Sequence, residues 1–200
     1  METKRRIIVF GAGGRVGRAA VAAARGQGHQ VTGAGRADGE VTDPAAVARL
    51  AAGHDAAIVA VYDPAAAPGA FFPAVARALA EGLPAAGVKR LVSVGLASVL
   101  PTPAGELLMD TPGYPQEWRE FCLGHGAGTE ELRTAAPGTL DWVVLSPAGD
   151  FDHEGEPTGG YGFGPADVGS RITTADFARA LLDEIEAPSL HRTHAGVVAA

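Results

Sequence analysis

Three observations predict an α/β fold with a doubly wound parallel sheet in a single domain. Short β-branched runs alternate with Ala-rich segments of helical period along the chain. The interiors of these runs, such as residues 7–9 and 142–144, are continuously apolar, so helices should cover both faces of the sheet. A glycine-rich turn at residues 11–17 directly follows the first run. With 200 residues and 46% hydrophobic content, the chain is long enough for one core and short for two. Together these features are typical of a Rossmann-type domain spanning residues 1–200.

The predicted elements follow from the local patterns. The strands have β-branched or aliphatic interiors and are Arg5–Phe10, Gln30–Thr32, Ala56–Val61, Lys89–Val94 and Leu140–Leu145. The helices have an apolar face and are Val16–Arg25, Pro44–Ala52, Ala70–Ala80, a weaker Glu117–Thr134, and Ala175–Ile185. Asp43 and Thr174 are the predicted N-caps, and Pro44 occupies the first helical position after Asp43.

Bulk properties argue against several classes of protein. The net charge is −7, so no nucleic acid partner is expected. The single cysteine, Cys122, cannot form an internal disulfide, and six scattered histidines show no metal-ligand spacing. The apolar run after the charged start Met1–Arg6 is too short for a signal peptide, and no run reaches the roughly 18 residues of a membrane span. We therefore expect a cytoplasmic protein with no bound metal and no membrane contact.

Two long irregular segments, residues 96–115 and 147–170, are rich in Gly and Pro, and each follows a predicted strand. In an open α/β sheet such segments lie at the carboxyl ends of the strands, where ligands bind. Loops of this length are usually functional or disordered. We expect both to cover a substrate, and the glycine-rich second segment to be mobile until a ligand orders it. The alternative is that they are surface insertions without a role in binding.

The turn at residues 11–17 has the spacing G-x-x-G-x-x-G, formed by Gly11, Gly14 and Gly17. Glycine is needed there because the chain turns sharply, approaches a pyrophosphate closely and packs a helix onto a strand. The free N–H groups and the positive end of the helix dipole then bind the phosphates. A strand before the turn, a helix after it and a second strand ending about twenty residues later make this a dinucleotide-binding pattern.

The end of the second strand favours NADPH over NADH. An NAD-preferring site places Asp or Glu there to bind the ribose 2′-hydroxyl, whereas this chain has Arg36. A guanidinium can bind a 2′-phosphate through two hydrogen bonds, and Arg15 adds a second positive charge. Asp38 and Glu40 lie close enough in sequence to oppose this preference, or they belong to a solvated turn. The residues expected to contact the cofactor are Gly11, Ala12, Gly13, Gly14, Arg15, Val16, Gly17, Arg36, Val41, Ala60, Val61, Tyr62, Val94, Gly95 and Pro147.

Several later segments, Asp110–Pro115, Leu145–Ala148, Gly155–Tyr161 and Ser170–Ile172, carry a family resemblance. With the glycine-rich turn and Arg36, they resemble the atypical short-chain dehydrogenase/reductases of the NmrA-like and NADH-flavin reductase type, which include biliverdin reductase B-like proteins. The resemblance covers nearly the whole chain. It implies a compact Rossmann domain whose nicotinamide site lies under the loops after the fourth and fifth strands.

The chain departs from these relatives in its catalytic residues. None of its three tyrosines has a lysine four residues later, so the Tyr-x-x-x-Lys pair of ordinary short-chain dehydrogenases is absent. Biliverdin reductase B-like proteins use a Ser and a His, and the matching positions here are Leu96 and Ala148. The departure counts against bilin chemistry.

The absence of the Tyr-x-x-x-Lys pair favours a hydride acceptor that can delocalise negative charge. Reducing an isolated ketone needs an acid, which typically contributes about 10²–10⁴-fold. A flavin or quinone spreads the charge over its own carbonyls, so positioning supplies much of the catalysis. Other side chains could still donate a proton or touch the substrate, and each has a purely structural alternative. These candidates are Ser93, Ser98, His125, Ser146, Asp150, His153 and Tyr161. Tyr161 is as consistent with a packing anchor for its loop as with stacking on a planar ligand.

The predicted function is therefore NADPH-dependent hydride transfer to a flavin, a quinone or another planar conjugated small molecule. Two alternatives remain open. One is an NmrA-like sensor that binds NADP(H) without turnover, which the missing catalytic pair favours. The other is a non-reductive isomerase or dehydratase of a biosynthetic pathway.

Overall fold

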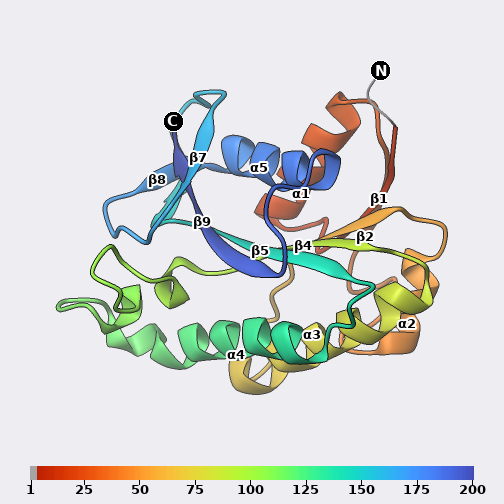
Figure 1. Ribbon diagram of the computed structural model, residues 1–200, viewed down its shortest axis with the longest axis horizontal. Coiled ribbons are helices and arrows are strands. Elements are labelled where there is room, and N and C mark those ends of the chain that lie inside the picture. Colours follow the sequence, from red (N-terminus) through yellow and green to blue (C-terminus); the bar gives the residue numbers. More distant parts are fainter. Residues whose placement is uncertain (1–3) are drawn as a thin grey trace.

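The computed structural model describes residues 4–200 and has one central sheet of seven strands (Figure 1). Its strands are β1 (Arg6–Phe10), β2 (Gln30–Ala34), β3 (Ala56–Val59), β4 (Arg90–Val94), β5 (Asp141–Pro147), β7 (Tyr161–Gly164) and β9 (Thr193–Ala199). The spatial order is β2-β1-β3-β4-β5-β9-β7, and every adjacent pair is parallel except β7 with β9. The strand order reverses between β1 and β3, which creates the crevice where ligands bind in such sheets. The predicted Rossmann fold is confirmed.

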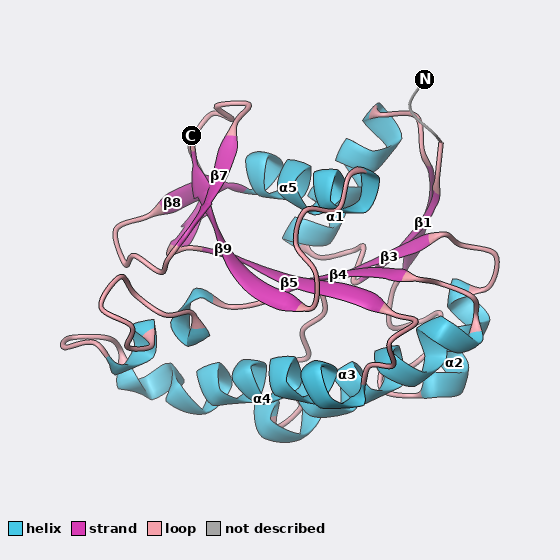
Figure 2. Cartoon of the chain, in the orientation of Figure 1, coloured by secondary structure: helices cyan, strands magenta, loops and turns pink. Residues whose placement is uncertain are grey.

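Five long helices cover the two faces of the sheet (Figure 2). They are α1 (Arg15–Gly26), α2 (Pro44–Ala51), α3 (Pro68–Ala85), α4 (Arg119–Ala135) and α5 (Thr174–Glu186). The helices α1 and α5 pack on one face, and α2, α3 and α4 pack on the other. Residues 7–10 of β1 are fully or almost fully buried between them. The continuous apolar strands are thus explained by burial on both faces.

All five predicted strands and all five predicted helices are present, with shifted ends. The cap of α2 is Asp43, whose Oδ1 accepts a hydrogen bond from the Ala45 N–H at 3.0 Å. The prediction of Thr174 as the cap of α5 was wrong, because the side chain of Thr173 accepts the bond from the Asp176 N–H. Four strands were not predicted: β7, β9 and the two-stranded pair β6 (Asp150–Asp152) and β8 (Arg171–Thr173). They are short or interrupted by Gly and charged residues, so pairing rather than propensity stabilises them.

The weakly predicted helix α4 is continuous because its glycines serve packing. A Cβ on Gly124 would lie 2.7 Å from backbone atoms of Pro68, and one on Gly128 would lie 3.0 Å from Phe72 Cβ. Both contacts are with α3, so these glycines allow the two helices to approach closely. Helix–helix packing here outweighs the low helix propensity of glycine.

The long segment 147–170 has more regular backbone hydrogen bonding than its composition predicts. Its middle is held by Asp176 of α5, whose carboxylate accepts bonds from the N–H groups of Thr158 and Gly159, each at 2.9 Å. Strand β7 then pairs antiparallel with β9 at the sheet edge. The prediction that this whole length is irregular was wrong for β6 and β7, and its role as a substrate cover and its mobility stay predictions. The other segment, 96–115, contains the short 3-10 turns η1 (Ala97–Val99) and η2 (Leu108–Asp110), and η3 (Gln116–Trp118) follows it.

Within residues 4–200, no helix is both long and apolar enough to cross a membrane. In the same range, no three His, Cys, Asp or Glu side chains are grouped as a metal site. Part of the chain start used for the signal-peptide prediction, residues 1–3, lies outside the described residues.

Candidate active site

The glycine-rich turn connects β1 to α1, and two of its glycines are required by the protein itself. Gly11 has φ +78°, and a Cβ there would lie 2.1 Å from the carbonyl oxygen of Ala60. A Cβ on Gly17 would lie 2.1 Å from the carbonyl oxygen of Gly11. These two positions therefore let the chain turn against the end of β3 and seat α1 on the turn.

The other side of the turn is open. A Cβ on Gly13 would meet no atom within 4 Å, and one on Gly14 would be closest to the Gly11 carbonyl at 3.3 Å. Gly14 is the N-cap of α1 and, among residues 4–200, no side chain caps that end of the helix. The first N–H groups and the positive end of the helix dipole thus face space that an anion can fill. A cofactor pyrophosphate fits this cradle.

A cleft of 340 Å³ extends from the turn to the ends of β2 and β3. Eight of the predicted cofactor residues line it, namely Gly11, Gly13, Gly14, Arg36, Val41, Ala60, Val61 and Tyr62. We call this space the cofactor cleft. Of the remaining predicted residues, Gly17 is buried under the turn, Val94 and Gly95 line another cavity, and Pro147 is buried in β5.

Charged groups of both signs lie near the end of β2. Arg36 lines the cofactor cleft with a side chain that is 65% exposed, and its Nη2 lies 3.4 Å from Asp63 Oδ1. Asp38, the nearby acid that could oppose a phosphate, accepts a hydrogen bond from the Gly35 N–H at 2.8 Å. Its carboxylate therefore closes the turn in which it lies. Arg36 keeps most of its surface accessible to a ligand.

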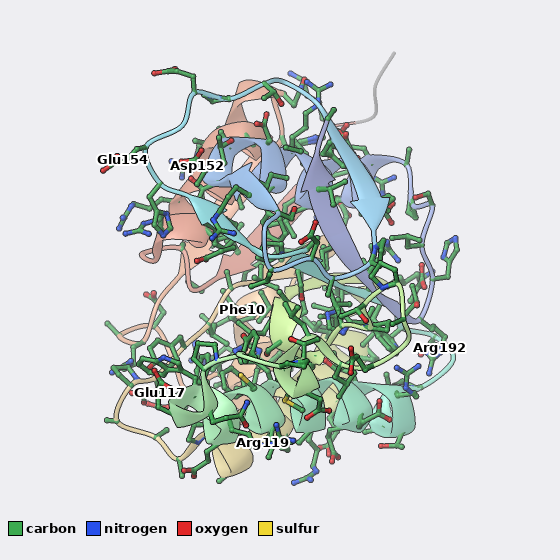
Figure 3. The ribbon with its side chains drawn as sticks, turned by 90° about the vertical axis from the view of Figure 1, so that its left-hand side faces the viewer. Phe10, Glu117, Arg119, Asp152, Glu154 and Arg192 are labelled. Carbon is green, nitrogen blue, oxygen red and sulfur yellow. The ribbon has the colours of Figure 1, made fainter. Side chains whose placement is uncertain are left out.

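His153 lies beside the cofactor turn, at its outer edge. Nη1 of Arg15, the first residue of α1, lies 2.7 Å from Nε2 of His153. Figure 3 looks onto this edge of the molecule, with Asp152 and Glu154 on one side of Phe10 and Glu117 on the other. The structure therefore places the candidate His153 next to the phosphate cradle, on the same side as the β6 segment.

Two other candidates, Ser93 and His125, line a cavity of only 40 Å³ between the sheet and helices α3 and α4, and this cavity shares Val61 with the cofactor cleft. Burial lowers the pKa of His125 to about 4, and the nearby His194 contributes to the shift. Burial likewise lowers the pKa of His194 to about 4, and its Nε2 lies 2.7 Å from Ser146 Oγ. Both imidazoles are therefore neutral at pH 7. The cavity is too small for a planar substrate.

A larger space of 380 Å³ lies between the segments that follow β4 and β5, and we call it the acceptor pocket. It is lined by Leu96, Ala97, Ser98, Leu108, Tyr114, Pro115, Trp118, Phe121, Cys122, Gly149, Asp150, Val168 and Arg171. Of the predicted candidates, it contains Asp150 and Ser98. Sequence reasoning gave no site role to Tyr114, Trp118 and Phe121. The motif Asp110–Pro115, which contains Tyr114, was the available signal.

The acceptor pocket adjoins the cofactor cleft. The ring of Tyr62, which lines the cleft, meets the ring of Phe121, which lines the pocket, edge to face with centroids 5.3 Å apart. The two spaces have no lining residue in common, and this ring contact connects their linings. A dinucleotide and a second small molecule can occupy neighbouring positions there.

Tyr161 does not belong to this arrangement. Its hydroxyl donates a hydrogen bond to Asp183 Oδ2 of α5 at 3.0 Å, and its ring packs with the core on the α1 and α5 face. It lines neither the cofactor cleft nor the acceptor pocket. The interpretation of Tyr161 as a substrate-stacking or catalytic residue was wrong, and the alternative of a packing anchor agrees with its contacts.

Comparison with known proteins gives the family. Residues 33–188 match the NAD(P)H-binding family, which is more than half of the chain. The chain belongs to the NAD(P)H-binding family. A relative from Bacillus subtilis, the uncharacterized protein YwnB, is 37% identical over 120 residues, which cover 56% of this chain and 55% of that protein. The chain thus matches about half the length of this curated relative. The predicted binding of a nicotinamide cofactor is confirmed.

Solved structures agree with this family over nearly the full length. A "putative exported protein" from Burkholderia pseudomallei is 32% identical with a TM-score of 0.81, covering 97% of this chain and 99% of that one. A "putative NADH-flavin reductase" from Streptococcus pneumoniae is 26% identical with a TM-score of 0.80, covering 98% and 100%. A "putative epimerase" from Bacteroides thetaiotaomicron is 26% identical with a TM-score of 0.84, covering 98% of each chain. The predicted relation to atypical short-chain dehydrogenase/reductases is confirmed.

Proposed function

We propose that this NAD(P)H-binding protein is an oxidoreductase that uses NADPH, in preference to NADH, to reduce a flavin, a quinone or another planar conjugated small molecule. The observation that carries the proposal is the contact between Tyr62, which lines the cofactor cleft, and Phe121, which lines the acceptor pocket. Similarity to the protein named "putative NADH-flavin reductase" supports the reaction class. The cytoplasmic location expected from the sequence stays a prediction.

The residues of the cofactor cleft account for binding and orientation. The open N–H groups around Gly14 would bind the pyrophosphate, and Arg36 would bind a 2′-phosphate through charge-assisted hydrogen bonds. Val41 and the end of β3 would line the adenosine part. When bound, the cofactor supplies a hydride.

The acceptor pocket supplies position rather than a strong acid. Its apolar side chains, including Trp118 and Phe121, exclude water and favour a flat ring. The missing Tyr-x-x-x-Lys pair matters less when the acceptor spreads negative charge over its own conjugated system. Holding the acceptor beside the cofactor is then the main contribution of the protein.

A spectrophotometric assay of NADPH oxidation with menadione, riboflavin and FMN tests this function. We expect turnover with at least one acceptor and its loss in Gly14→Val, because the branched side chain would occupy the phosphate cradle. Gly26→Val is the matched control, since a Cβ at that end of α1 meets no atom within 4 Å. Calorimetric NADPH titration should show the same pattern of binding. Retained NADPH affinity in Gly14→Val would contradict the site assignment.

A redox sensor that binds NADP(H) without turnover is the second candidate function. It is favoured because Ser93 and His125 lie in a cavity too small for a substrate and Tyr161 packs on α5, which leaves few candidates for catalysis. Tight NADPH binding without oxidation by any acceptor would support the sensor. Product formation without loss of NADPH would instead indicate a non-reductive enzyme.

A further inference from the structure

The acceptor pocket has the size and rim of a site for a compact ring system. Its 380 Å³ lies near the lower end of the roughly 300–1,000 Å³ typical of small-molecule sites. Trp118 and Val168 line it while being 62% and 65% exposed. Large apolar side chains exposed around a concavity indicate a surface that a ligand covers. A molecule of two fused rings suits this space better than a bulky one.

One polar group in the pocket has no partner. Ser98 is completely buried, and its hydroxyl makes no hydrogen bond within the described chain. Burying a hydroxyl without a partner is unfavourable, so such groups call for an explanation. Ser98 lies in η1, the first turn after β4, and it lines the acceptor pocket. An acceptor atom of a ligand would satisfy it once rotation of the Ser98 side chain turns the hydroxyl towards the pocket.

The Tyr114 hydroxyl is the second donor at this place. It lies near the Ser98 hydroxyl and the Cys122 thiol, on the segment opposite Asp150. Burial raises the pKa of Tyr114 and Cys122 adds to the rise, which together outweigh the lowering effect of the neighbouring Ser98 hydroxyl, so the phenol stays protonated. A neutral phenol and a neutral alcohol are both able to donate to a carbonyl oxygen. No lysine is needed for either group to do so.

We propose that the acceptor pocket binds a compact quinone and that the Tyr114 and Ser98 hydroxyls donate hydrogen bonds to one of its carbonyl oxygens. The inference rests on the proposed function for the identity of the reaction, and it adds the acceptor class and two binding residues. Reduction of a quinone increases the negative charge on its oxygens. Hydroxyl donors in the pocket wall stabilise that charge.

Calorimetric titration of the NADP⁺-loaded protein tests binding in the absence of hydride transfer. The probes are menadione and 2-methylnaphthalene, which has the same two fused rings but no carbonyl oxygen. We expect Tyr114→Phe and Ser98→Ala each to weaken menadione binding about three- to tenfold. Binding of 2-methylnaphthalene and of NADP⁺ should remain unchanged. Tyr161→Phe is the matched control because its hydroxyl bonds to Asp183 on α5, and it should leave menadione binding unchanged.

The outcomes separate this inference from the proposed function. Absence of menadione binding to the wild-type protein, or equal weakening of both probes in Tyr114→Phe, would overturn the inference. Wild-type NADPH oxidation by menadione together with unaltered affinity in both variants would overturn it while leaving the oxidoreductase function standing. The expected binding pattern without NADPH oxidation would support the quinone site and contradict the proposed reaction.

Discussion

The cofactor cleft and the acceptor pocket are built in different ways. The phosphate end of the cleft is a main-chain structure, formed by one turn, residues 11–17, against the end of β3. The pocket is a side-chain structure, formed where residues 96–122 meet residues 149–171. A main-chain site depends on backbone angles that only glycine adopts easily, whereas a side-chain site depends on how distant segments meet. The first kind of site can therefore be recognised in a sequence far more easily than the second.

The two long segments after β4 and β5 differ in a similar way. Residues 96–115 contribute side chains to the acceptor pocket over much of their length. Residues 147–170 contribute only near their two ends, and their middle is bonded to Asp176 and paired with β9. Mobility was expected only of the second segment, which has seven glycines against two in the first. The middle of the second segment is anchored, because the buried carboxylate of Asp176 accepts backbone N–H groups there.

Acid should destabilise the fold mainly through two buried histidines, His125 and His194. His125 and His194 have pKa values of about 4 in the folded chain and about 6.5 when unfolded, so the unfolded state binds protons first as the pH falls. The contribution of the two neutral imidazoles to the free energy of unfolding is present above pH 6.5, is lost progressively between pH 6.5 and 4, and is absent below pH 4. The loss is up to roughly 3 kcal/mol for each group and less than the sum for both.

Urea denaturation at pH 7, 5.5 and 4.5 measures this loss. We expect His194→Gln to reduce the pH dependence of the free energy of unfolding, because one buried imidazole is removed. His153→Gln is the control at an exposed position and should leave this pH dependence unchanged. Equal pH dependence in all three proteins would show that the buried histidines do not control acid stability.

The anchoring of the second segment is tested by Asp176→Ala. The carboxylate is buried and accepts bonds from Thr158, Thr173 and Gly159. Burial alone would raise the pKa of Asp176, but these hydrogen bonds outweigh it and lower the pKa. Because several donors lose their partner, we expect a loss of about 3 kcal/mol in the free energy of unfolding and roughly 10 °C in Tm.

Thermal unfolding of Asp176→Ala beside Asp183→Ala provides the measurement. Asp183 accepts the single hydroxyl of Tyr161 and lies partly exposed on α5, so its loss should cost less. An unchanged Tm in Asp176→Ala would mean that residues 156–164 are a free cover rather than part of the fold.

The smallest of these effects concerns the charged end of the cofactor cleft. Arg36→Glu should weaken NADPH binding roughly tenfold to a hundredfold and leave NADH binding nearly unchanged, since only NADPH carries the 2′-phosphate. Arg25→Glu, at the far end of α1, makes the same change in charge and should alter neither affinity. Calorimetric titration with both cofactors gives the comparison. Equal losses for the two cofactors would indicate that Arg36 acts through its ion pair with Asp63.

Sequence reasoning located the elements that carry strong local signals and missed those that depend on pairing. The apolar strands and the turn at residues 11–17 were predicted because each is specified within a few residues. The strand β9 and the hydrogen bonds to Asp176 join parts of the chain far apart in sequence. For Tyr161 the sequence left a packing anchor and a stacking residue equally open, because its glycine-rich surroundings did not indicate that β7 pairs with β9.

By itself, the sequence determined a Rossmann sheet buried on both faces and a glycine turn able to bind a dinucleotide, because both depend on backbone conformation and local periodicity. Only the tertiary structure decided that Tyr114 and Ser98 share one pocket and that Ser93 and His125 line another, much smaller cavity. It also decided that the middle of the second segment is anchored. These facts depend on side chains from distant segments and on their burial, and no short stretch of sequence specifies such contacts.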